Sequence, residues 1–310
     1  RESREERLHR DRKGIQFIMS VAGVIRSAKM TSLLESRTVS IVGCGVMGSR
    51  IAAAWARGGF RVRLFDVVVE RAEQVRQQLF HDGDGSSPPT PSAAGPVERR
   101  VCVARTIAAA AEADLVIETI SEDLPAKLSL LEDISRNAGG ETLIASNTSS
   151  LPISRLASAV MRPGRFCGMH FCHPADIRCL VEIAPASQMD AATCSRGIEL
   201  LRRIGKVPVL VRDTPGFLLN RLLVPYLNEA LELLLEGVEL AALNRAALAF
   251  GMPVGPLAML DQFGIDIALA VGRSLLQAYP DRVIPSELLI AVYKSGYRGA
   301  KSAAGFCVGT

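Results

Sequence analysis

The 310-residue sequence lacks a strong excess of either charge, a CxxC pair of cysteines and a long hydrophobic run. Its formal net charge is only +4, and its basic residues are mixed with acidic ones, which argues against a nucleic-acid partner. An odd number of cysteines, seven, argues against a complete disulfide framework and favours a reducing, cytoplasmic location. Residues 15–25 are too short and too interrupted an apolar stretch to cross a bilayer, so we expect no membrane association.

The amino-terminal residues 1–37 open with the mixed-charge stretch RESREERLHRDRKG, which has no hydrophobic core of its own. We expect this extension to be disordered. Its acidic residues argue against a transit peptide, and Met30 is a candidate natural start because the recognisable domain begins a few residues later.

The rest of the chain is 48% hydrophobic overall and long enough for two domains. Apolar runs that alternate with helical patterns predict an α/β fold over residues 38–212, a Rossmann-type, mostly parallel sheet domain covered on both faces. Residues 213–310 contain consecutive helical patterns and predict a smaller all-α C-terminal domain. The predicted strands are 38–44, 61–66, 97–104, 113–120, 142–150, 165–172, 179–185 and 207–213. The sheet domain's predicted helices include 67–80, 124–138 and 153–161, and the low-complexity segment 83–96 is predicted to be an exposed loop.

A glycine-rich turn follows the first predicted strand. Gly43, Gly45 and Gly48 have the GxGxxG spacing between a β-branched run and an Ala-rich helical pattern. Gly43 permits the tight turn, Gly45 admits a pyrophosphate close to the backbone, and Gly48 lets the helix pack on the strand. We expect these glycines, with Val46 and Met47 between them, to bind a dinucleotide at the helix N-terminus.

Asp66 follows Gly48 by 18 positions, at the end of the next predicted strand. A carboxylate there can accept hydrogen bonds from the ribose hydroxyls, which predicts NAD as the cofactor. NADP is an alternative because Arg63 and Arg71 could meet a 2′-phosphate, although Asp66 would repel it. The glycine spacing itself does not exclude FAD.

Five segments, taken in order, resemble one enzyme family. They are IVGCGVMGSRIA, SNTSSL, GMHFCHP, LVEI and TPGFLLNR, and the sequence resembles the 3-hydroxyacyl-CoA dehydrogenases over about residues 38–306. The resemblance implies an oxidoreductase of fatty acid metabolism that uses NAD to oxidise a 3-hydroxyacyl thioester to the 3-oxoacyl thioester. It also implies a homodimer formed through the helical domain.

The resemblance assigns His170 as the base that takes the proton of the 3-hydroxyl, and Glu182 as the carboxylate that orients its ring. An imidazole titrates near neutral pH and suits that task. Taken alone, a histidine on an apolar strand is more often a core residue. Ser149 and Asn220 match polar residues at the substrate hydroxyl, although the hydroxyl of Ser149 could equally cap a helix.

Three charged residues, Glu122, Lys127 and Lys301, match family positions near the nicotinamide, its ribose or the phosphates. Each could instead be an ordinary surface charge. No metal is expected.

An alternative interpretation is a metal site formed by His170, Cys172, His173 and Cys179. The alternation of side chains along a strand and the spacing of the four residues both argue against a zinc site.

The sequence departs from the family pattern at three places. His173 replaces the usual Asn of HFFNP beside the reacting carbons, where it would contact the substrate. The segment 83–96 stands where the family has an arm that binds coenzyme A, and the tail KSAAGFC is unusual. HFCHP also resembles the dehydrogenases that oxidise a glyceryl unit on an acyl carrier protein to make polyketide extender units. An acyl-carrier-protein thioester is therefore an alternative to an acyl-CoA substrate.

Two rival functions use the same fold. A catalytically silent NAD-binding sensor or scaffold fits the changed residues but not the retained His170 and Glu182. A β-hydroxyacid dehydrogenase would need a lysine base on the interdomain helix, where this chain has Asn220 and Arg221.

Overall fold

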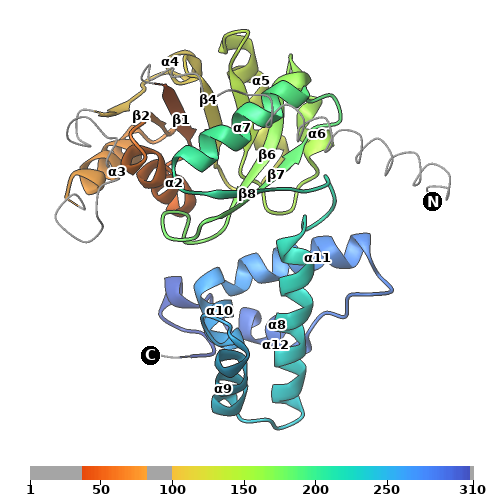
Figure 1. Ribbon diagram of the computed structural model, residues 1–310. Coiled ribbons are helices and arrows are strands. Elements are labelled where there is room, and N and C mark those ends of the chain that lie inside the picture. Colours follow the sequence, from red (N-terminus) through yellow and green to blue (C-terminus); the bar gives the residue numbers. More distant parts are fainter. Residues whose placement is uncertain (1–36, 82–99, 308–310) are drawn as a thin grey trace, which may run out of the picture. The chain divides into compact units, whose positions relative to one another are not determined.

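The computed structural model describes residues 37–81 and 100–307 and divides the chain into two compact units. The first unit ends at Asp213 and the second begins at Thr214 (Figure 1). The domain boundary predicted from the sequence lies between residues 212 and 213. The predicted extension 1–37, apart from Arg37, and the predicted loop 83–96 lie outside the described residues.

The first unit is built on an eight-stranded sheet with the strand order β3-β2-β1-β4-β5-β6-β7-β8. Every neighbouring pair is parallel except β6 and β7, which confirms the predicted mostly parallel, Rossmann-type sheet. The strands are β1 (Thr38–Val42), β2 (Arg61–Phe65), β3 (Val101–Val103), β4 (Leu115–Glu118), β5 (Leu143–Ser146), β6 (Phe166–Phe171), β7 (Leu180–Pro185) and β8 (Val207–Leu210).

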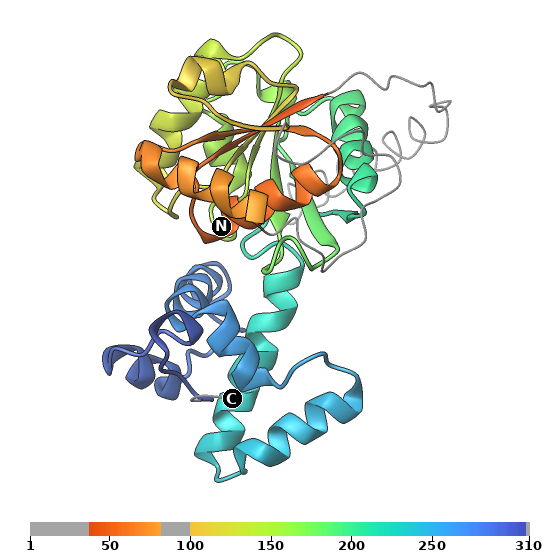
Figure 2. The same ribbon diagram turned by 90° about the vertical axis from the view of Figure 1, so that its left-hand side faces the viewer.

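Helices cover both faces of this sheet (Figures 1 and 2). One face packs its alternate apolar residues against α2 (Val46–Arg57), α3 (Val69–His81) and α7 (Ala191–Arg203) in a single core around the fully buried Trp55. The other face carries α4 (Ile107–Ala111), α5 (Leu124–Asn137) and α6 (Ile153–Ala157), with the short η2 (Pro163–Arg165) before β6. Side chains alternate along a strand, so strand residues that do not belong to this core face the layer of α4, α5 and α6.

Helix α6 is shorter than the predicted helix 153–161, since it ends after five residues at Ala157. Its N-terminus is capped from a distance by Asp213, which accepts hydrogen bonds from Ile153 N at 2.8 Å and Ser154 N at 2.7 Å. At its other end the Ser158 hydroxyl bonds to the carbonyl of Arg155, and such local side-chain bonds compete with helix continuation. The carboxylate of Asp213 therefore ties the end of the first unit to the segment that follows β5.

The second unit is all α, as predicted. Its helices are α8 (Leu219–Leu235), α9 (Leu240–Phe250), α10 (Pro256–Phe263), α11 (Ile265–Ala278) and α12 (Glu287–Lys294), followed by η3 (Ala300–Ser302). They enclose a core of their own that includes Leu231 and Leu257. Buried Asp261 accepts bonds from Phe306 N and Cys307 N at 2.9 and 2.7 Å, which holds the C-terminal segment on α10. No helix among the described residues is long and apolar enough to span a membrane.

Candidate active site

The glycine turn between β1 and α2 has the geometry that a bound pyrophosphate needs. Gly43 has φ +105°, a conformation that favours glycine, and its N–H bonds to Phe65 O. A Cβ on Gly48 would lie 1.9 Å from Gly43 O, so the helix packs directly on the turn. A Cβ on Gly45 would meet nothing within 4 Å, and Gly45 offers no side-chain cap to the first turn at Val46. Open space thus lies beside an uncapped helix N-terminus, which is suited to an anion.

Asp66 comes directly after β2 and is 8% exposed. Its two oxygens accept bonds from Cys44 N at 2.8 Å and Val68 N at 2.9 Å, which fix the carboxylate and leave lone pairs for ribose hydroxyls. Burial and the charge of Asp66 raise the pKa of the Cys44 thiol to about 12, so that side chain is neutral. These residues fit a dinucleotide with a free ribose hydroxyl.

Arg63, which the sequence offers as a partner for a 2′-phosphate, is used elsewhere. Its guanidinium donates to Ala109 O at 2.8 Å and to the carbonyl of Glu112, at the end of α4. This side chain therefore does not point to the ribose end of the turn.

His170 and Glu182 lie directly opposite each other in the antiparallel pair β6–β7. His170 Nδ1 is 2.7 Å from Glu182 Oε2, and the side chains are 8% and 1% exposed. An ionised carboxylate only accepts, so Nδ1 donates, and the other ring nitrogen, Nε2, is the one that carries the lone pair. The pair faces the α4–α6 layer near the carboxyl end of β6.

Glu122 organises the turn that follows β5. Its Oε1 accepts bonds from Thr148 Oγ1 at 2.5 Å, from Ser149 N and Ser150 N at 3.0 Å, and from Ser150 Oγ at 2.8 Å. Burial opposes ionisation of Glu122, but the charge of Lys127 and these hydrogen bonds outweigh it and lower its pKa. Ser149 is therefore held on a turn anchored by a carboxylate.

Lys127 is 1% exposed. It is therefore a buried charge, and the alternative of an ordinary surface charge is wrong. Its ammonium donates to Glu118 Oε1 at 2.6 Å and lies 3.5 Å from Glu122 Oε2. Ser146 Oγ donates to the other oxygen of Glu118 at 2.6 Å. These contacts join the ends of β4 and β5 to the start of α5.

Asn147 lies close to His170 through a backbone contact that the sequence does not predict. Its Oδ1 accepts a bond from Phe171 N at 2.9 Å, one residue after His170, and so extends the link between β5 and β6 beyond their last paired residues. Asn147 stands in the SNTSS segment, between a strand and a helix, where an amide side chain typically caps the helix. Its actual partner is 24 residues away, which a local pattern does not reveal.

His173 lies just beyond β6 in the segment that leads to β7. Burial and the neighbouring charge of Arg50 lower its pKa, against the opposing effect of Asp176, so the ring is neutral at pH 7. A neutral imidazole can both donate and accept, as the family's amide does.

Two of the predicted site residues belong to the second unit. Asn220 is in the first turn of α8 and is 1% exposed. Lys301 lies in η3 and forms an ion pair of 2.5 Å with Asp266 of α11.

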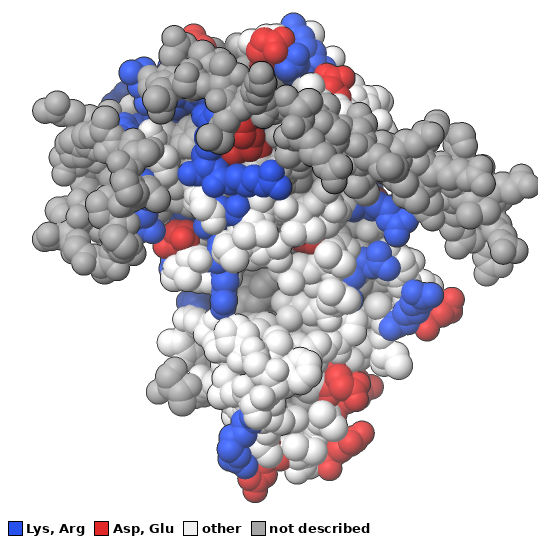
Figure 3. All heavy atoms as spheres, in the orientation of Figure 1, with Lys and Arg blue, Asp and Glu red and all other residues white. Residues whose placement is uncertain are grey.

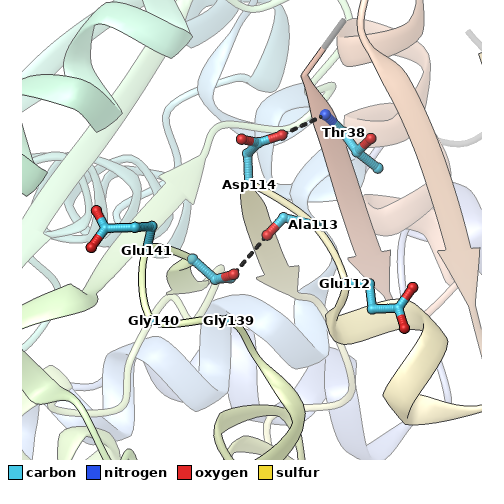
Figure 4. A pocket seen from close by; sticks show the side chains of 8 residues that line it. Thr38, Glu112, Ala113, Asp114, Gly139, Gly140 and Glu141 are labelled. Carbon is cyan, nitrogen blue, oxygen red and sulfur yellow. Dashed lines mark hydrogen bonds between the residues drawn. The ribbon is translucent and has the colours of Figure 1, made fainter.

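A hollow of about 400 Å³ lies at the amino ends of the strands, whereas the glycine turn and Asp66 follow their carboxyl ends (Figure 4). It is lined by Thr38, Asp114 and Thr142, at the amino ends of β1, β4 and β5, and Asp114 accepts a bond from Thr38 N at 2.9 Å. Ligands of open α/β sheets bind at the carboxyl ends, so this hollow is not the cofactor site. Among the described residues no group of three or more His, Cys, Asp or Glu could hold a metal ion.

A doubly wound sheet with this glycine turn and this acid after β2 defines an NAD-binding oxidoreductase domain. Comparison with known proteins specifies the family. The family model for the 3-hydroxyacyl-CoA dehydrogenase NAD-binding domain matches residues 38–214, and the model for the C-terminal domain of the same family matches residues 216–308.

Individual relatives agree with these matches. The chain is 36% identical over 280 residues to a probable 3-hydroxybutyryl-CoA dehydrogenase of Bacillus subtilis, covering 88% of this chain and 97% of the relative. The crystal structure of (S)-3-hydroxybutyryl-CoA dehydrogenase from Ralstonia eutropha is 32% identical, with a TM-score of 0.78 and coverage of 89% and 100%. FadB2 from M. tuberculosis is 27% identical with a TM-score of 0.80 and the same coverage. The chain belongs to the 3-hydroxyacyl-CoA dehydrogenase family and is an NAD-dependent oxidoreductase of that family.

Alanine substitutions at Gly45 and Gly48 should have separate effects, one on cofactor binding and the other on stability. We expect Gly45→Ala to keep the thermal midpoint of unfolding but to raise the Kd for NADH at least tenfold, because its methyl enters the open space beside the uncapped helix N-terminus. Gly48→Ala should instead destabilise the sheet unit by about 1–3 kcal/mol, since its methyl meets backbone. Fluorescence titration with NADH and thermal unfolding measure both effects. Unchanged NADH affinity in Gly45→Ala would contradict this placement of the pyrophosphate.

Proposed function

We propose that this protein oxidises the 3-hydroxyl group of a short-chain acyl-CoA thioester, with the buried His170–Glu182 pair as its catalytic centre. The observation that supports the proposal best is the 2.7 Å contact between His170 Nδ1 and Glu182 Oε2, which assigns the ring proton to Nδ1 and the basic lone pair to Nε2. Bound NAD⁺ supplies the hydride acceptor for carbon 3 of the substrate. His170 takes the hydroxyl proton at Nε2 and becomes an imidazolium, and its Nδ1–H remains bonded to Glu182.

Glu182 stabilises that imidazolium and fixes the orientation of the ring. Its carboxylate is 1% exposed, so little water competes for its charge. In this proposal Ser149 and Asn220 hold the substrate oxygen, and His173 contacts the acyl group. Asn147 positions His170 through the backbone of the next residue.

The cofactor is bound, in this proposal, by the turn from Gly43 to Gly48 and by Asp66. Glu122 and Lys127 act near the nicotinamide, where their mutual attraction keeps the Ser149 turn in place. Lys301 is assigned to the same end of the cofactor by resemblance to the family.

The acyl-CoA substrate is proposed from two relatives, a probable 3-hydroxybutyryl-CoA dehydrogenase and an (S)-3-hydroxybutyryl-CoA dehydrogenase. One alternative substrate is a glyceryl unit on an acyl carrier protein, because His173 and the segment 83–96 depart from the family pattern. A silent NAD-binding role is disfavoured because the His170–Glu182 geometry is intact. A cytoplasmic location is proposed because all seven cysteines are free thiols.

Two substrates distinguish these possibilities. The purified protein should form NADH with (S)-3-hydroxybutyryl-CoA and not with glyceryl-acyl carrier protein, measured at 340 nm. Turnover of the carrier-protein substrate alone would replace the acyl-CoA proposal with the alternative. NADH binding without turnover of either thioester would favour the silent role.

Removal of the base should lower turnover strongly. We expect His170→Ala to lower kcat by about 10²–10⁴ because the hydroxyl proton then has no acceptor, while the Kd for NADH stays within twofold. Glu182→Gln should also lower kcat, since an amide cannot stabilise the imidazolium by charge. Steady-state kinetics measure both, and near-normal turnover of His170→Ala would remove this residue from the role of base.

The second unit supports the proposal of a homodimer. It exposes large apolar side chains on several helices, with Phe250 86%, Leu222 66% and Leu235 56% exposed, and Ile284 before α12 is 78% exposed. Much of this unit's face visible in Figure 3 carries no charge. Apolar surface of this kind is typical of subunit contacts. Light scattering should give a mass about twice the chain mass of 33.2 kDa, and a monomer at micromolar concentration would contradict this.

A further inference from the structure

The segment 172–179, here called the His173 loop, connects the two strands that carry His170 and Glu182. Inside the loop, Ile177 N and Arg178 N both bond to Pro174 O, at 3.1 and 2.8 Å. These two bonds form one turn and do not attach the loop to the rest of the unit. The loop is attached at its end by the bond of Val207 N to Cys179 O at 2.8 Å and in its middle by fully buried Ala175, and side chains from other elements hold the rest.

Lys206 reaches the loop from the residue before β8. It is 7% exposed, and its ammonium donates to Ala175 O at 2.7 Å and to Arg178 O at 2.8 Å. Burial lowers the pKa of Lys206, and the negative charge of Asp176 opposes this shift. A buried ammonium loses its hydration, so these two carbonyls are strongly held acceptors.

Asp176 ties the same loop to the cofactor-binding helix α2. Its Oδ1 accepts a bond from Arg50 at 2.9 Å, and its Oδ2 lies 3.6 Å from Arg57. Burial opposes the ionisation of Asp176, but the hydrogen bond and charge of Arg50, with a smaller contribution from Arg57, lower its pKa. Arg50 follows the last glycine of the turn by two residues, so the contact links the pyrophosphate helix to the loop.

We propose that Lys206 and the Arg50–Asp176 ion pair are positioning groups for His173, and that they set the affinity of the site for its acyl thioester. The proposal rests on the proposed contact between His173 and the substrate. Lys206 holds the loop from the β8 side and Asp176 holds it from the α2 side. The loop is thereby fixed against the helix that binds the dinucleotide.

A positioning role and a purely stabilising role predict different results. The Arg50 side chain is 40% exposed, and half-exposed ion pairs contribute little to global stability. Removing the pair should therefore change the loop and the substrate affinity more than the unfolding midpoint. A purely stabilising role would change the midpoint and leave the kinetic constants of the folded fraction unchanged.

The test uses Asp176→Asn and Lys206→Met in the full chain, with Arg203→Met as control because Arg203 pairs only with Glu199 on the surface of α7 among the described residues. We expect the KM for (S)-3-hydroxybutyryl-CoA to rise about threefold in Asp176→Asn and about tenfold in Lys206→Met. The KM for NAD⁺ should stay within twofold in all three variants. The exchanged pair Arg50→Asp with Asp176→Arg should recover part of the loss seen in Arg50→Asp alone.

Hydrogen exchange gives a readout that needs no turnover. The amides of Ile177 and Arg178 should exchange at least threefold faster in Asp176→Asn and Lys206→Met than in the wild type and in Arg203→Met. Unchanged loop exchange and unchanged thioester KM in Asp176→Asn would overturn the proposal, even if Lys206→Met fails to fold. An inactive wild type would contradict the proposed function alone, because the exchange comparison still decides whether these side chains fix the loop.

Discussion

Within an otherwise parallel sheet, the antiparallel pairing of β6 with β7 places His170 opposite Glu182. Paired residues on antiparallel strands point to the same face, so one register brings the imidazole and the carboxylate together without any loop supplying either group. A slip by one residue would move Glu182 to the opposite face. The register is supported on both sides, by parallel β5 next to β6 and by parallel β8 next to β7. His170 and Glu182 are therefore both carried by interior strands of the sheet.

Buried charges join the neighbouring strand ends. Glu118 and Lys127 are almost fully enclosed, and isolated ions there would carry a large desolvation cost. Each has its partners: Lys127 binds Glu118 and Ile120 O, and Ser146 binds the remaining oxygen of Glu118. A network that is satisfied in this way allows a single arrangement of the β4 and β5 ends. Glu122 connects this network to the turn that carries Ser149, because it pairs with Lys127 and accepts a bond from Ser149 N.

Local sequence patterns predicted the elements well, because apolar periodicity and turn residues act over a few positions. All eight strands were expected, and so were the glycine turn and the acid after β2. The same patterns could not predict that Asp213 caps the N-terminus of α6, 60 residues earlier. Helix α6 also ends at Ala157, before the predicted end, where the Ser158 hydroxyl bonds to the carbonyl of Arg155. Lys127 could be read as an ordinary surface charge because its partner Glu118 lies nine residues upstream, on a strand. Arg50 and Asp176 are 126 residues apart, and nothing in either segment predicts their contact.

This difference follows from how the two halves of the site are built. The dinucleotide half consists of backbone approach and one carboxylate, so a short glycine spacing encodes most of it. The proposed substrate half depends on side chains that meet across the sheet: Asn147 binds the residue after His170, and Lys206 binds the loop after it. If His173 contacts the substrate as proposed, a change at this position alters what the site accepts while the cofactor half stays intact. Within one family, cofactor use should follow from the turn, whereas substrate choice should follow from the contacts that hold the His173 loop.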